Sequence, residues 1–267
     1  MGKINDLKDQ ALATLKGKWG SFVGLTFIYI LLYGLASCLT QFGSIFQGSS
    51  FTTITWILTV IGVIVSILFV PMQYGYYIAH LNSSRQDLPA DIGDLFCGYR
   101  RFTDVFFTLL LQMLVIIGIM IPAFLFIGIM AGLGQMESHS GLFILIAFLL
   151  MIPGIVLSFA YAMVPFILHD KPELHPVEVL RESRMMMQDH KMEYFLLLLS
   201  FIGWGILCVF TFFIGFLWLA PYIQMTEVKY YEELRAEYEG VGKEEVPTQE
   251  DVEMPAEQMQ EPEEITE

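Results

Sequence analysis

Long apolar runs separated by short charged segments make up most of this chain. Residues 20–79, 105–134, 142–168 and 195–226 contain no Asp, Glu, Lys, Arg or His. An α-helix needs about 20 apolar residues to cross the hydrocarbon core of a bilayer, because each residue advances the helix by about 1.5 Å. Every run reaches that length, so the pattern predicts a helical membrane protein with several crossings.

We expect an all-α, polytopic transmembrane fold with six crossings arranged as three helical hairpins, and five crossings as the alternative. The run 195–226 decides the count, because it is long for one helix and short for two. A turn near Thr211–Gly215 would place Trp204 and Trp218 at the interface, where tryptophan concentrates, and this favours two crossings. Within a transmembrane domain over 20–236, the expected crossings are about 20–39, 55–80, 105–132, 142–168, 192–210 and 213–233.

The two ends of the chain differ from the membrane part. Apolar residues at the start recur at spacings of three and four: Ile4, Leu7, Ala11, Leu15 and Trp19. This spacing predicts an amphipathic helix within residues 1–19 that lies on an anionic leaflet. Residues 237–267 are rich in Glu and Pro and poor in aromatic residues, which predicts a disordered acidic tail.

Lysine and arginine indicate the orientation in the membrane. Segments 1–19, 81–104 and 169–193 carry eleven of them, whereas the linkers 40–51 and 133–141 carry none. Because cytoplasmic loops are enriched in these residues, we expect a multi-pass plasma-membrane protein with a cytoplasmic N-terminus. Six crossings would leave the acidic tail cytoplasmic as well, and five would place it outside.

Composition excludes several classes of protein. The chain is 55% hydrophobic and only 16% charged, whereas soluble domains carry about 25% charged residues. This excludes a soluble enzyme or a nucleic-acid-binding protein, and makes membrane lipids the expected partners, with a membrane or cytoplasmic protein as a possible further partner. The three cysteines have no spacing typical of a disulfide framework or metal site, so we expect no cofactor.

The densest polar group in the sequence is His169, Asp170 and His175, together with Lys171 and Pro172. One hypothesis makes the two histidines and the aspartate metal ligands or an acid–base pair. The interpretation we favour is a helix that ends at the membrane surface, where Pro172 stops it and the polar side chains meet lipid headgroups.

Further along, Arg181, Arg184 and Lys191 lie on a predicted surface helix that begins near Pro176. They are candidates for contact with anionic lipid headgroups or with a partner protein. Their charge also contributes to topology, and the two roles are compatible.

Several segments resemble a known bacterial family of integral membrane proteins, domain of unknown function (DUF) 975. The residues that carry the resemblance are Ala11-Leu-x-x-Leu-Lys-Gly-Lys-Trp19, Phe166-Ile-Leu-His-Asp-Lys-Pro172, Glu178-Val-Leu-Arg-Glu-Ser-Arg-Met-Met186, Leu199-Ser-Phe-Ile-Gly-Trp204, Pro221-Tyr222 and Tyr230-Tyr231. The resemblance covers roughly residues 5–236. It implies a membrane fold and a plasma-membrane location, but no catalytic residues, because the family has no established activity. The chain departs from the family pattern at Gln188-Asp189-His190, where a glycine followed by a polar pair is expected.

Three functions remain open at this stage. We favour a non-enzymatic accessory or scaffold protein that contacts lipids or partner proteins, because the apolar runs contain no ionisable side chain for catalysis or coupled transport. The alternative is a transporter or lipid-handling carrier of neutral or amphipathic molecules. A third possibility, an intramembrane hydrolase, requires His169 and Asp170 to face one pocket. A water-accessible central cavity would favour the carrier, whereas tightly packed hairpins or a laterally open groove would favour the scaffold or a role in lipid binding.

Overall fold

The computed structural model describes residues 2–45, 52–132 and 140–244, which are helical apart from short turns. The elements are α1 (Gly2–Leu15), α2 (Trp19–Ile45), α3 (Thr52–Gln86), the 3-10 helix η1 (Ile92–Arg101), α4 (Phe102–Gly132), α5 (Ser140–Ala160), α6 (Val164–Asp170), α7 (Pro176–Met186), α8 (Lys191–Leu199), α9 (Ile202–Phe210) and α10 (Phe216–Glu244). The predicted all-α fold is confirmed for this part of the chain.

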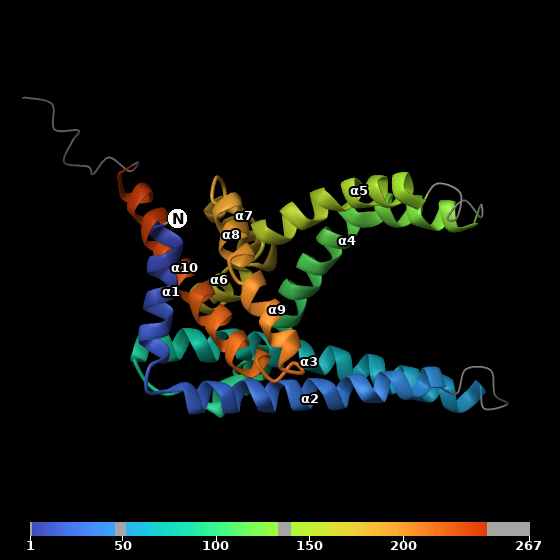
Figure 1. Ribbon diagram of the computed structural model, residues 1–267, viewed down its shortest axis with the longest axis horizontal. Helices are drawn as coiled ribbons and strands as arrows, with labels where there is room; N and C mark the ends of the chain where they lie inside the picture. Colours follow the sequence, from blue (N-terminus) through green and yellow to red (C-terminus); the bar gives the residue numbers. More distant parts are fainter. Residues whose placement is uncertain (1, 46–51, 133–139, 245–267) are drawn as a thin grey trace, which may run out of the picture.

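Two long helical hairpins diverge from a shared base (Figure 1). Helices α2 and α3 pack along each other in one hairpin, and α4 and α5 do so in the other. We call the outer parts of these hairpins the arms: residues 27–45 with 52–70, and 110–132 with 140–158. The remaining helices and the adjoining ends of α2, α3, α4 and α5 form the base.

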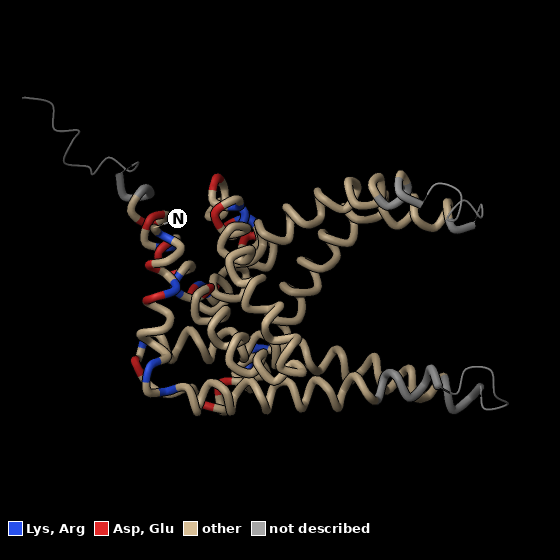
Figure 2. Tube along the Cα trace, in the orientation of Figure 1, with Lys and Arg blue, Asp and Glu red and all other residues tan. Residues whose placement is uncertain are grey.

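Five segments of the described chain are long and apolar enough to cross a membrane: Trp19–Cys38, Trp56–Gln86, Ile92–Met130, Leu145–Asp170 and Lys191–Phe210. Charged residues gather on the base, and the described parts of the arms carry none (Figure 2). The predicted sixth crossing, 213–233, falls on α10 and is not among the five, since charged residues follow the apolar start of that helix from Glu227 onward. The five spans match the alternative count, and a sixth crossing stays a prediction.

Helix α1 packs against α10 and does not present its apolar face to a leaflet. Leu7, Ala11 and Leu15, on the face expected to touch lipid, are at most 1% exposed and belong to the protein core. Lys8 extends from the same helix over the ring of Phe201, 4.2 Å from its centroid, and burial lowers the pKa of this lysine. Helix α10 continues beyond the apolar run 195–226, and its own apolar side chains pack against this face of α1.

The run 195–226 forms two helical segments joined by a turn. Helix α9 ends at Phe210 and α10 begins at Phe216, so the turn occupies the position expected from the sequence. Phe212 and Phe213 adopt left-handed backbone conformations there, with φ of 51° and 65°. The first of the two segments is itself divided between α8 and α9, close to Ser200.

The expected crossing 142–168 is also divided, into α5 and α6, by a turn at residues 161–163. The end of α5 leaves carbonyl groups without partners inside the helix. Ser183 on α7 supplies one partner, because its hydroxyl donates to the carbonyl of Ala160 at 2.9 Å. A surface helix begins at Pro176, as expected, and its contact with α5 explains how the divided helix is held.

Between α3 and α4 the chain forms η1, which lies directly against α3. A Cβ added at Gly75 would overlap the carbonyl oxygen of Leu95, and one added at Gly98 would overlap that of Pro71. The two glycines therefore allow the backbones of α3 and η1 to approach more closely than side chains permit. The sequence indicated only a polar segment here.

The predicted boundary of the acidic tail at residue 237 is wrong, because α10 continues to Glu244. Tyr238 packs against the core, and Arg235 forms an ion pair with Glu239 one turn further along, at 2.8 Å. These contacts extend the helix past the last apolar residues of the membrane part. The remainder of the predicted tail, and part of both predicted linkers, lie outside the described residues.

Candidate functional site

Asp170 lies at the end of α6 and links this helix to α3 and α10. Its side chain is 5% exposed. Arg85 on α3 donates two hydrogen bonds to the carboxylate, at 2.6 and 2.8 Å. From α10, the hydroxyl of Tyr231 donates at 2.7 Å, and Arg235 forms an ion pair with the same carboxylate. Paired geometry of this kind between arginine and carboxylate is both strong and directional, so Asp170 stabilises the base.

The two candidate histidines differ in their surroundings. His169 is half-buried, whereas His175 is exposed just before α7, where its backbone N–H donates to the carboxylate of Glu178 at 2.9 Å. This contact is typical of a helix start. Within the described residues, no group of three His, Cys, Asp or Glu side chains could hold a metal ion. Helix α6 does end at Asp170, and the contact of these side chains with lipid headgroups stays a prediction.

The three predicted headgroup contacts lie on neighbouring surface elements. Arg181 and Arg184 are exposed on α7, and Lys191 is the half-buried first residue of α8. Their contact with lipid headgroups or a partner protein stays a prediction.

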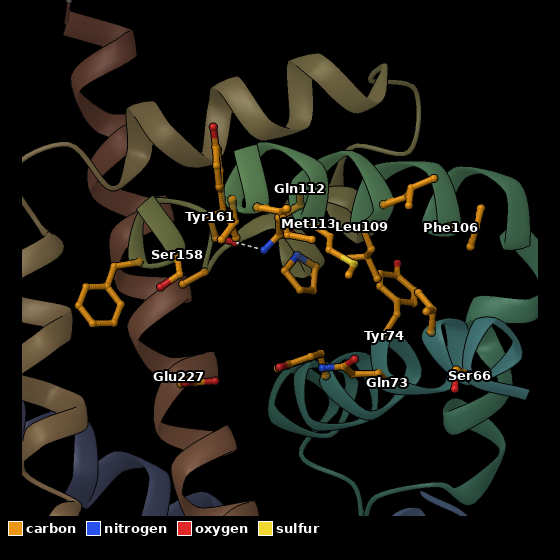
Figure 3. Close-up of a pocket in the computed structure, with 18 of the residues that line it drawn as sticks. Ser66, Gln73, Tyr74, Phe106, Leu109, Gln112, Met113, Ser158, Tyr161 and Glu227 are labelled. Atoms are coloured by element: carbon orange, nitrogen blue, oxygen red, sulfur yellow. Dashed lines mark hydrogen bonds between the residues drawn. The ribbon is translucent and has the colours of Figure 1, made fainter. Parts of the chain in front are cut away.

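A cavity of about 870 Å³ lies between the two hairpins where they leave the base. Its longest walls are α3, from Val63 to Tyr77, and α4, from Phe106 to Ile117. Residues from α5, α6, α8 and α10, together with the turn between α5 and α6, complete the lining (Figure 3). This volume falls within the range of about 300–1,000 Å³ that is usual for small-molecule sites.

The lining of the cavity changes in character along its length. Toward the arms it consists of aliphatic side chains, including Val63, Ile67 and Ile117. Ser66 lies among them, but its hydroxyl donates to the carbonyl of Gly62 in its own helix at 2.9 Å. The polar side of this residue is thus already satisfied, and the wall presents an apolar surface.

The base end of the cavity carries the polar groups. The hydroxyl of Tyr194 on α8 donates to Oε1 of Glu227 on α10 at 2.8 Å. Glu227 points toward α3, on which Gln73 lies exposed (Figure 3). The side-chain amide of Gln112 donates to the carbonyl of Tyr161 at 3.5 Å, and its Oε1 is buried without a partner among the described residues. Hydrogen-bonding capacity is therefore available at this end.

Neither this cavity nor its polar residues were expected from the sequence. The apolar runs hold no acidic or basic side chain, and Glu227 stands directly after the run 195–226. Gln73 and Gln112 are isolated amides inside two other runs. Uncharged polar residues within otherwise apolar crossings were the available signal, but their spacing along the chain did not show that they converge.

The apolar spans, the diverging hairpins and the gathering of the described charged residues on the base define a polytopic, all-α integral membrane protein. More specifically, the chain belongs to the family described as Protein of unknown function (DUF975), which matches residues 1–238. The resemblance seen in the sequence is thus confirmed over the whole membrane part. No curated protein and no solved structure matches the chain.

Proposed function

We propose that the protein binds an amphipathic molecule in the cavity between its hairpins and acts as a lipid-handling carrier. The observation that supports this is the polarity gradient of the cavity, from aliphatic walls beside Ile67 and Ile117 to hydrogen-bonding groups at Gln73 and Glu227. An amphiphile has the same gradient along its own length, so its chain and its head each meet a matching surface. Of the functions that the sequence leaves open, this proposal takes the lipid-handling carrier.

We propose binding without catalysis, and a location in the plasma membrane with both termini on the cytoplasmic side. Eleven Lys and Arg residues in the segments at the base support that orientation. The six-crossing topology, which the proposal requires for a cytoplasmic C-terminus, would be overturned by a reporter fused after Glu267 that is active only outside the cell.

Native mass spectrometry after purification in a mild neutral detergent tests the binding function. The protein should retain one defined amphipathic molecule per chain. Replacing Leu109, which lines the cavity on α4, with tryptophan should remove this adduct because the indole ring occupies the space. The matched control is Leu114→Trp on the same helix, whose side chain is 56% exposed and does not line the cavity. Equal retention by both variants would contradict the proposal.

An accessory or scaffold role is the second candidate. Helix α7 favours it, because Val177 and Met185 are 58% and 46% exposed beside the exposed side chains of Arg181 and Arg184. Flexible methionine together with arginine suits a protein-binding surface. In the same mass spectrometry experiment, a stoichiometric protein partner that persists in Leu109→Trp and is lost in Arg181→Glu would favour this role over the carrier.

A further inference from the structure

Glu227 is the acidic residue of the cavity lining, and none of the described lining residues is Lys, Arg or His. The hydroxyl of Tyr194, which donates a hydrogen bond to Glu227, is uncharged. Among the described residues, no basic side chain lies within ion-pair distance of Glu227. A carboxylate removed from bulk water is costly without a cationic or hydrogen-bonded partner. The protein supplies a hydrogen bond to Glu227 but no cation, and a ligand with a positive charge can supply the cation.

Aromatic rings surround the same space. Tyr74 and Tyr77 on α3 and Tyr194 on α8 line the cavity together with Glu227. Tyr194 is fixed by its hydrogen bond to the carboxylate and by an edge-to-face contact with Phe159, at 5.8 Å between ring centroids. Faces of tyrosine rings attract cations, and a group of such rings is a usual site for alkylated ammonium.

From this arrangement we propose that the cavity selects amphiphiles with a cationic ammonium head, which Glu227 pairs with while Tyr77 and Tyr194 surround its alkyl groups. The inference rests on the proposed function and names the class of ligand. The inference also predicts that the cavity prefers a simple alkylammonium to a zwitterionic phospholipid. A phosphate would need a cationic or strong donor partner, and the described lining offers no Lys or Arg.

Three probes of equal chain length separate these possibilities: dodecyltrimethylammonium, dodecylphosphocholine and dodecyl maltoside. The measurement is the fraction of wild-type protein that carries one probe in native mass spectrometry, at equal free concentrations in one neutral detergent. We expect dodecyltrimethylammonium to bind about tenfold more tightly than the other two, as a partly desolvated cation–π and charge pair allows.

Glu227→Gln keeps the shape of the side chain and removes its charge, so it should bring dodecyltrimethylammonium to the level of dodecyl maltoside. The matched control is Glu237→Gln on the same helix, whose side chain is 52% exposed and does not line the cavity. This control should keep the wild-type preference. Tyr194→Leu removes an aromatic ring but keeps the carboxylate of Glu227, so this variant should lose part of the preference for dodecyltrimethylammonium.

The outcomes separate this inference from the proposed function. Equal binding of all three probes in wild-type protein, with loss of all three in Leu109→Trp, would overturn the ammonium selectivity and leave the carrier function standing. A preference for dodecylphosphocholine would also overturn it, in favour of a zwitterionic lipid. Failure of every probe to bind wild-type protein, or binding unaffected by Leu109→Trp, would overturn both. The wild-type comparison is decisive even if Glu227→Gln does not fold.

Discussion

The base and the arms are both helical but are stabilised in different ways. In the base, Leu15, Ile78 and Val228 are fully buried, and ion pairs join helices that are far apart in sequence. In the arms, large apolar side chains such as Trp56 and Leu125 are 72% and 59% exposed. The base thus carries its own core, whereas the arms depend on an apolar solvent.

This difference explains the position of the cavity. Paired helices in the arms touch one another but have no third layer, so the space between the hairpins has walls only where the base begins. Burial of apolar surface does not favour association of helices inside lipid, because the acyl chains are equally apolar. The arms can therefore remain apart without losing stability, and the proposed ligand would enter between them from the bilayer.

The largest expected effect of a single substitution in the base is at Asp170. Asp170→Asn should lower the free energy of unfolding by about 3 kcal/mol, because it removes the buried charge that Arg85 and Arg235 share. Each arginine then keeps only its more exposed partner, Glu232 for Arg85 and Glu239 for Arg235. Denaturant unfolding in mixed micelles measures this change. Asp189→Asn is the control, since asparagine tolerates the left-handed backbone at this turn, where φ is 66°. Equal stability of both variants would show that the base does not depend on these ion pairs.

A smaller effect should separate glycines of the base from glycines of the arms. Gly75→Ala forces α3 and η1 apart and should destabilise the protein by about 2 kcal/mol. Gly118→Ala in the second arm meets open space, so it should be neutral or stabilising by up to about 1 kcal/mol. The same unfolding titration compares them. If Gly118→Ala were as damaging as Gly75→Ala, the arm would have to be packed against another element.

The smallest effect should come from the ion pair between Lys18 and Asp87, which joins the start of the first hairpin to its end. The aspartate side chain is 86% exposed, and such pairs contribute little. Lys18 lowers the pKa of Asp87 by its hydrogen bond and charge, so any stabilisation is present at neutral pH and is lost as the pH falls through the lowered pKa. Asp87→Asn should therefore differ slightly from wild type at pH 7 and converge with it below the ordinary aspartate pKa of about 3.9. If the difference in stability between Asp87→Asn and the wild type grew as the pH fell, this pH dependence would be contradicted.

Much of the fold could be predicted from local patterns in the sequence. Long uncharged runs predict membrane helices, and the length of the run 195–226 together with Trp204 and Trp218 predicts the turn near Thr211–Gly215. The apolar face of α1 could be predicted, but α10 as the helix that covers it could not. Periodicity shows that a face is buried and does not show which element buries it. The close contact at Gly75 was missed for the same reason.

The candidate site was less accessible to sequence analysis. Asp170 was singled out beside His169 and His175, yet its partners Arg85 and Tyr231 are distant in the sequence and lie on other helices. The cavity is likewise lined by residues from helices that are distant in the sequence, and none of these residues forms a recognisable motif within its own helix. Neighbouring residues in the sequence were enough to predict the helix that begins at Pro176. The partners of Asp170 and the lining of the cavity depend on contacts between distant segments.

Photolabelling with a diazirine-bearing alkylammonium, followed by peptide mapping, tests the central claim that the cavity is a ligand site and the outer arm faces are only solvated by lipid. The account predicts labelling at cavity residues such as Leu109 that saturates and is displaced by unlabelled dodecyltrimethylammonium. Labelling at Leu125, on the exposed side of the same helix, should rise with probe concentration without saturating or being displaced. Labelling at both positions that rises in proportion to the probe and resists displacement would contradict the account.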